Sequence, residues 1–171
     1  MKTKIITILT AAVILLLVSE AWATSISFYE DGVIQEGDVY DYVGLFNDST
    51  VHMTGGIVTF TLAAWDSSTV NVSAGILGGL GSLEFSTLNL SGDMEADTPG
   101  VSDSGTLNMF GGNVGLIEAW NYSTVNLHGG IISEYLQAYG TEDLVISIYG
   151  YGFEYDPLAG DYHGGQLTGF L

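Results

Sequence analysis

The chain has 171 residues and a formal net charge of −18, with no cysteine and with Lys2 and Lys4 as its two Lys or Arg residues. A protein this acidic repels phosphate groups, which excludes nucleic acid and anionic membrane surfaces as partners. Disulfides are excluded as well, so a hydrophobic core must stabilise the folded part.

The first 23 residues have the layout of a cleavable signal peptide. Lys2 and Lys4 form a short basic segment, Ile5 to Val18 is largely apolar, and Ala21-Trp22-Ala23 offers a small-x-small cleavage site. The apolar run of 14 residues is shorter than the roughly 20 that a membrane-spanning helix needs. We therefore expect residues 1–23 to be a helical signal peptide. The mature protein would be secreted, held at the cell surface or kept in the periplasm.

Residues 24–48 carry two turn signals, Glu30-Asp31-Gly32 and Glu36-Gly37-Asp38, but no copy of the repeat that follows. The ends of a repeat protein expose unpaired backbone and need capping. This segment is predicted to be an N-terminal cap or an irregular first rung.

Residues 49–143 hold an internal repeat. Its signature is Ser or Gly, Thr, aliphatic, Asn or His, aliphatic, and then one or two glycines after a further residue. The threonines of the five copies are Thr50, Thr69, Thr87, Thr106 and Thr124, which are spaced by 19, 18, 19 and 18 residues. The alternation has the period of a β-strand with one apolar and one polar face, and the glycines favour a chain turn.

A unit this short cannot bury its apolar face alone, so the copies must stack. We predict an all-β fold, a single-stranded right-handed parallel β-helix (β-solenoid) of about five rungs of 18–19 residues. A β-sandwich is the main alternative, but its strands occupy unlike environments and would not explain a constant repeat. In the third copy, acidic residues replace the second apolar patch, so Gly92 to Asp103 is predicted to be a solvated bulging loop.

Residues 144–171 begin with an apolar run, Leu144 to Ile148, which is predicted to be the last strand. The remainder is rich in Tyr, Phe and Gly. It is predicted to fold over the last rung as a C-terminal cap by burial of aromatic rings.

Units such as Ser123 to Gly130, followed by Ile148 to Phe153 and Gly164 to Gly169, resemble the short-repeat exported proteins of environmental bacteria that are associated with PEP-CTERM sorting tails. Such a tail has a Pro-Glu-Pro signal, an apolar span and a basic end, and this chain stops at Leu171 without them. The resemblance therefore implies a released protein or a shortened gene. It implies no biochemical activity.

The carboxylates and histidines are the candidate catalytic groups. Glu84 and Glu118 lie at similar places in rungs two apart, a separation that a glycosidase pair could have. Nothing else marks a cleft around them, so two solvated carboxylates are the preferred interpretation. His52, His128 and His163 do not share one place in the repeat and are expected to be surface residues rather than metal ligands. No enzyme is predicted, and a polysaccharide-active enzyme is the alternative.

The one candidate for a metal is Ca²⁺ at Asp93, Glu95 and Asp97, where carboxylates alternate along the third copy. The EF-hand pattern fails, because the sixth and twelfth places of that loop are Thr98 and Ser104. A solvated loop is preferred over a weak calcium site, and no other cofactor is expected.

The most regular surface feature is a column of threonines and asparagines. Stacking along the column would stabilise the rungs, and contact with carbohydrate or with ice are the alternatives. Trp65 and Trp120 are further candidates for carbohydrate contact. The column consists of Thr50, Thr69, Asn71, Thr87, Asn89, Thr106, Asn108, Thr124 and Asn126.

These observations predict an exported, non-enzymatic structural or adhesive protein of the cell exterior. A carbohydrate-binding or carbohydrate-cleaving module of the same fold is the alternative. Neutral polysaccharides, other envelope proteins and further copies stacked end to end are the partner classes that fit the acidic surface.

Overall fold

The computed structural model describes residues 24–140, 143–156 and 166–170, and the regular secondary structure within these ranges is entirely β-strand. The predicted signal peptide, 1–23, lies outside them. The strands are β1 (Ser25–Phe28), β2 (Gly32–Ile34), β3 (Val39–Leu45), β4 (Thr50–Ala64), β5 (Thr69–Ser82), β6 (Thr87–Val101), β7 (Thr106–Val114), β8 (Ile117–Ala119), β9 (Thr124–Ile132), β10 (Leu136–Ala138), β11 (Val145–Ile148), β12 (Tyr151–Asp156) and β13 (Gln166–Phe170).

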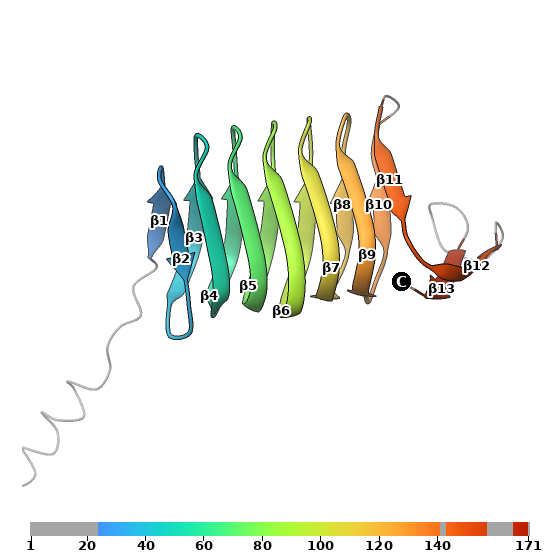
Figure 1. Ribbon diagram of the computed structural model, residues 1–171, viewed down its shortest axis with the longest axis horizontal. Helices are drawn as coiled ribbons and strands as arrows, with labels where there is room; N and C mark the ends of the chain where they lie inside the picture. Colours follow the sequence, from blue (N-terminus) through green and yellow to red (C-terminus); the bar gives the residue numbers. More distant parts are fainter. Residues whose placement is uncertain (1–23, 141–142, 157–165, 171) are drawn as a thin grey trace, which may run out of the picture.

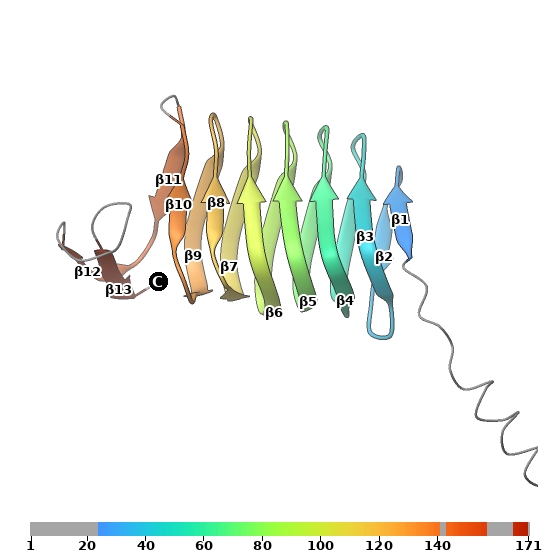
Figure 2. The ribbon, with the colours of Figure 1, turned by 180° about the vertical axis from the view of Figure 1, so that it is seen from behind.

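The strands β1 to β11 form one continuous coil of parallel pairs, in which each turn of the chain pairs with the turn before and the turn after it (Figures 1 and 2). The main path of the sheet runs β1-β3-β4-β5-β6-β7-β9-β11. The coil has about six turns. The prediction of an all-β, parallel β-solenoid is confirmed.

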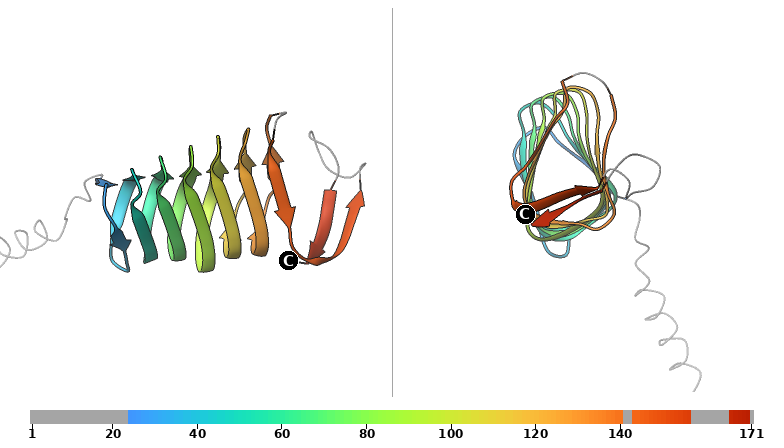
Figure 3. Two further views of the ribbon diagram at one scale, coloured as in Figure 1. Left: turned by 45° about the horizontal axis from the view of Figure 1, so that its top comes forward. Right: turned by 90° about the vertical axis from the view of Figure 1, so that its right-hand side faces the viewer.

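Each turn has three sides, which gives the coil a three-sided outline when it is viewed along its axis (Figure 3). In β4, the first side is Thr50 to Met53, and the chain then bends at Gly55-Gly56. Gly56 has a φ of +83°, and a Cβ there would lie 2.7 Å from the Gln35 carbonyl oxygen of the preceding turn. Glycine is therefore required at this bend by both conformation and space.

The core fills the coil from end to end with aliphatic side chains from all three sides. On the first side, the apolar pair of each repeat points inward, as Val70 and Val72 do in β5 with no exposed surface. Thr69 and Asn71, which alternate with them along the strand, are half-buried on the outside. The signature of the repeat is thus the pattern of a strand with one dry face.

Residues 32–45 already form a full turn of the coil, ahead of the first copy of the repeat. Gly32 pairs with Val51, and Leu45 pairs with Ala64, in the same registers as later turns. This turn carries Val33 where the others have Asn or His, and Glu36-Gly37 where the next turn has Gly55-Gly56. Its residues Ile34, Val43 and Leu45 are buried in the core, although Gly32 stands opposite Val51 and the outward signature is missing.

The predicted loop at Gly92 to Asp103 is wrong up to Val101, because these residues complete β6. Asp93 pairs with Ala74, and Val101 pairs with Ser82. Met94 and Ala96 are buried in the core, while the acids between them point outward. The acids do not replace the apolar patch; they alternate with it.

At the far end, β11 continues the sheet by pairing with β9, and it lies within the predicted last strand. The strands β12 and β13 form an antiparallel hairpin beyond the last turn (Figure 1). The predicted aromatic cap falls partly on residues 157–165 and 171, which lie outside the described residues.

Candidate functional site

The asparagines of the repeat form one continuous chain of side-chain hydrogen bonds along the outside of the coil. The Nδ2 of Asn89 donates to the Oδ1 of Asn71 at 2.9 Å, and Asn108 and Asn126 repeat the bond at 2.9 Å each. His52 stands at the same place in the preceding turn, since it pairs with Asn71. The threonines pair with one another in register beside this chain, as Thr69 does with Thr87. This column ties neighbouring turns together.

Replacing Asn89 by alanine is expected to destabilise the protein by about 2 kcal/mol, because two hydrogen bonds of about 1 kcal/mol each are lost. Asn126→Ala is the matched control, since Asn126 makes one bond in the chain and should lose about 1 kcal/mol. Urea denaturation of both variants measures the difference. Equal losses of stability in the two variants would mean that the second hydrogen bond of Asn89 adds no stability.

A second column lies at the turn that precedes each repeat, where several polar residues adopt a left-handed conformation. Asn47, Asp66, Glu84 and Asp103 have φ between +57° and +64°. The Asp66 carboxylate accepts the Asn47 backbone N–H at 2.8 Å, and the Glu84 carboxylate accepts that of Asp66 at 3.2 Å. The acids here serve as acceptors for the backbone of the turn before. A clue lay in the sequence, since Asn and Asp tolerate this conformation and recur two residues before the Ser or Gly of the repeat.

Glu84 and Glu118 do not occupy similar places, contrary to the sequence-based expectation. Glu84 lies in the left-handed turn, whereas Glu118 lies in β8 and pairs with Gly100. Gly100 in turn pairs with Gly81, which is three residues before Glu84. The two carboxylates therefore belong to different columns as well as to different turns.

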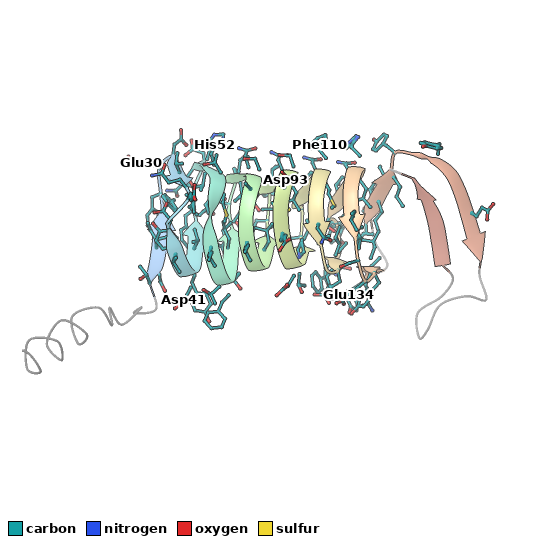
Figure 4. All side chains as sticks on the ribbon, turned by 90° about the horizontal axis from the view of Figure 1, so that it is seen from below. Glu30, Asp41, His52, Asp93, Phe110 and Glu134 are labelled. Carbon is teal, nitrogen blue, oxygen red and sulfur yellow. The ribbon has the colours of Figure 1, made fainter. Side chains whose placement is uncertain are left out.

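The calcium candidates Asp93, Glu95 and Asp97 alternate along β6, which puts the first and last about 13 Å apart along the strand. Glu95 and Asp97, with Asn113 and Glu134, line a shallow depression of about 260 Å³. In Figure 4, Asp93 and Glu134 project from opposite sides of the coil. Among the described residues, no group of three or more His, Asp or Glu side chains is placed to hold a metal ion.

The two described histidines also lie apart. His52 is exposed on β4, while the His128 ring is stacked between Phe110, at a centroid distance of 4.9 Å, and Tyr149, at 4.1 Å. Phe110 and His52 are labelled in Figure 4. His163 lies outside the described residues. His128 is part of an outward stack of rings that sequence reasoning missed.

A larger aromatic column, here called the turn column, runs along the edge where each turn ends. From the second member onward, the backbone N–H of each member bonds to the carbonyl oxygen of the residue just before the preceding member. The members therefore occupy equivalent places in successive turns. They are Tyr29, Phe46, Trp65, Leu83, Ser102, Trp120 and Tyr139. Phe46 and Trp65 stack at 5.0 Å and 3°, and Trp120 and Tyr139 at 5.3 Å and 12°.

A row of small residues lies beneath the turn column. These residues face outward from the last of the three sides of each turn. Gly44, Ala63, Gly81 and Gly100 pair with one another in register. A Cβ at Gly100 would lie 3.3 Å from the Trp120 ring. Ala63 faces outward and yet is only 6% exposed. The rings thus lean over a floor of small residues.

Glu118 and Gln137 continue the same register after Gly100 and put polar groups beside the ring pair of Trp120 and Tyr139. Partial burial raises the pKa of the Tyr139 phenol above its usual value. The negative charge of Glu118, and its hydrogen bond to the phenol, act in the same direction. Tyr139 and Glu118 therefore form a polar pair beside the Trp120 ring.

The chain matches no protein-family model, no curated protein and no solved structure at a significant level. Within the part of the chain that the structure describes, no helix has the length and hydropathy needed to cross a membrane.

Proposed function

We propose that the protein is an exported, non-enzymatic structural or adhesive element of the cell exterior. The observation that carries this proposal is that outward side chains of successive turns form columns of one chemistry, tied by hydrogen bonds along the axis. From Asn71 to Asn126, such a surface presents the same amide group at intervals of about 4.8 Å. It is suited to contact with an extended or repetitive partner rather than to conversion of one small substrate.

A non-enzymatic role is supported by the uses of the polar groups. The Asp66 and Glu84 carboxylates accept backbone N–H groups, and the asparagine amides bond to one another. Groups that are committed to backbone and side-chain hydrogen bonds in this way have less freedom to contact and orient a substrate.

The coil is proposed to be single-stranded and right-handed. Support comes from Figure 1, where strands on the near side run downward and those on the far side upward while the chain advances to the right. This is the sense of a right-handed screw. End-to-end association of copies is part of the proposal, since β1 and β2 each pair on one side only within the described sheet, and such edges favour pairing.

The proposal is tested in the native host with an epitope tag placed after Leu171. The expected result is a mature N-terminus at Thr24 in the medium or on intact cells, and weaker attachment of cells that lack the gene. Tagged protein that stays inside the cell with its first 23 residues intact would contradict the export step. Normal attachment of the deletion strain would contradict the adhesive role.

Carbohydrate binding is the second candidate. It is favoured by the turn column, since stacked aromatic rings beside carboxylate and amide groups are suited to holding sugar rings. Carbohydrate binding differs from the structural or adhesive role because it requires one defined binding site on the coil.

A further inference from the structure

The threonines of the first side, here called the threonine column, form the most regular outward array of the coil. One threonine begins this side in five successive turns, and each is half-buried. No shift of register falls between the threonine and the second aliphatic residue of any copy, so the hydroxyl and methyl groups recur about every 4.8 Å along the axis. The members are Thr50, Thr69, Thr87, Thr106 and Thr124.

The hydroxyl groups of the threonine column are not used by the fold. Within the described residues, none of the five has a hydrogen-bond partner in the protein. The asparagines two residues later differ, because their amides bond to one another from turn to turn. The amides hold the turns at a fixed spacing, and a β-branched side chain such as threonine is stiff at χ1. The hydroxyl groups are therefore ordered before any partner arrives.

The first side carries no Asp or Glu beside the threonine column, although the chain holds 20 of these residues. Its other outward residues are His52 and the asparagines of the amide chain. A basic partner finds no carboxylate here, and a sugar ring finds no Phe, Tyr or Trp on which to stack. The side is suited to an uncharged partner that offers hydrogen bonds at the same regular intervals.

A second copy of the chain does not fit this side. The threonine column is about 19 Å long and each strand of the side about 13 Å, which gives roughly 250 Å² of surface. A stable protein interface needs about 800 Å² from each partner. The acidic surfaces that flank the side would also repel each other in such a pair.

We infer that the threonine column binds ice. The outward groups of the first side are spaced by about 4.8 Å along the axis and about 6.8 Å along each strand, and both spacings are close to repeats of the water oxygens on the faces of ice crystals. The hydroxyl groups take places of lattice water molecules, and the methyl groups lie between them. This inference names a partner of the adhesive surface, and in that respect it rests on the proposed function.

The test measures recrystallisation of ice in frozen sucrose solution and the gap between melting and freezing points, using purified protein in the form that the host exports. The wild type is expected to stop recrystallisation and to open such a gap. Thr87→Tyr should raise the concentration required at least about tenfold, because the ring holds ice away from the neighbouring threonines. Thr98→Tyr is the matched control, since Thr98 is a half-buried threonine of the same strand that pairs with Gly79 on the third side. Its activity should stay within about twofold of the wild type.

Thr87→Ser guards against a folding defect, because it keeps the hydroxyl group and removes one methyl group. It should raise the required concentration about fourfold, as the loss of one apolar contact predicts. The inference is overturned if the wild type leaves ice unaffected, if both Thr87 variants are as active as the wild type, or if Thr98→Tyr loses as much activity as Thr87→Tyr. Binding to microcrystalline cellulose or chitin without an effect on ice would also overturn it and would favour the carbohydrate candidate.

These assays are made on purified protein, whereas export and attachment are measured on cells at temperatures where no ice is present. A failure of ice binding would therefore leave the export and attachment results unchanged, and it is distinguishable from a failure of the proposed function.

Discussion

Replacing Leu88 by alanine is expected to lower the free energy of unfolding by about 3 kcal/mol. Leu88 has no exposed surface and lies in the middle of the coil, where it pairs with Val70 on one side and Leu107 on the other. Truncation removes apolar contacts with both neighbouring turns, and the stacked backbone cannot collapse into the cavity because the sheet hydrogen bonds fix the spacing of the turns. Urea denaturation followed by far-ultraviolet circular dichroism measures the loss.

Phe85→Ala is the control, since Phe85 is a larger apolar residue three positions earlier that is 72% exposed. Its truncation should change stability by no more than about 0.5 kcal/mol. If both variants were destabilised equally, the stability of the coil would not come from the dry core between the turns.

The repeat was predictable because its outward and inward residues are both constrained. Val70 and Val72 must be apolar to fill the core, and Asn71 must be a short amide to bond with its counterparts in the next turn. Each constraint recurs once in every turn, so the sequence shows a period of 18 to 19 residues. Turns that satisfy only the inward constraint, such as residues 32–45, escape a search for the full signature.

The degenerate third copy illustrates the same limit. The charges of Asp93, Glu95 and Asp97 favour a solvated loop, although the neighbours Met94 and Ala96 show that the segment belongs to the core. A strand with one wet face tolerates any outward residue. Acidity in that position therefore says nothing about whether the segment is a strand or a loop.

The turn column could not be predicted from the sequence as a unit, since two of its seven members are not aromatic. Trp65 and Trp120 were recognised as surface aromatics, but their neighbours in space, Phe46 and Tyr139, are 19 residues away in each case. Only the register of the turns brings them together. To predict which side chains of a solenoid contact a ligand, the exact register of its turns must therefore be known. An error of one residue in the register moves a side chain to another face.

The second large effect is expected at Gly92, where substitution by alanine should cost about 3 kcal/mol or more. Gly92 has a φ of +62°, and a Cβ added there would lie well inside contact distance of the Ser73 carbonyl oxygen in the preceding turn. That oxygen belongs to the backbone, so it cannot rotate away as the end of a side chain would. The methyl group would have to push two turns apart.

Gly37→Ala separates the steric part of this cost from the conformational part. Gly37 has a φ of +93°, but a Cβ there meets nothing within 4 Å, so its substitution should cost only the strain of a left-handed residue, about 1 kcal/mol. The difference between the two variants in urea denaturation then reports the close approach of successive turns at Gly92. Similar losses for both would mean that the turns can separate freely at this corner, which is incompatible with a coil whose neighbours are held in register by continuous backbone pairing from Thr87 to Leu90.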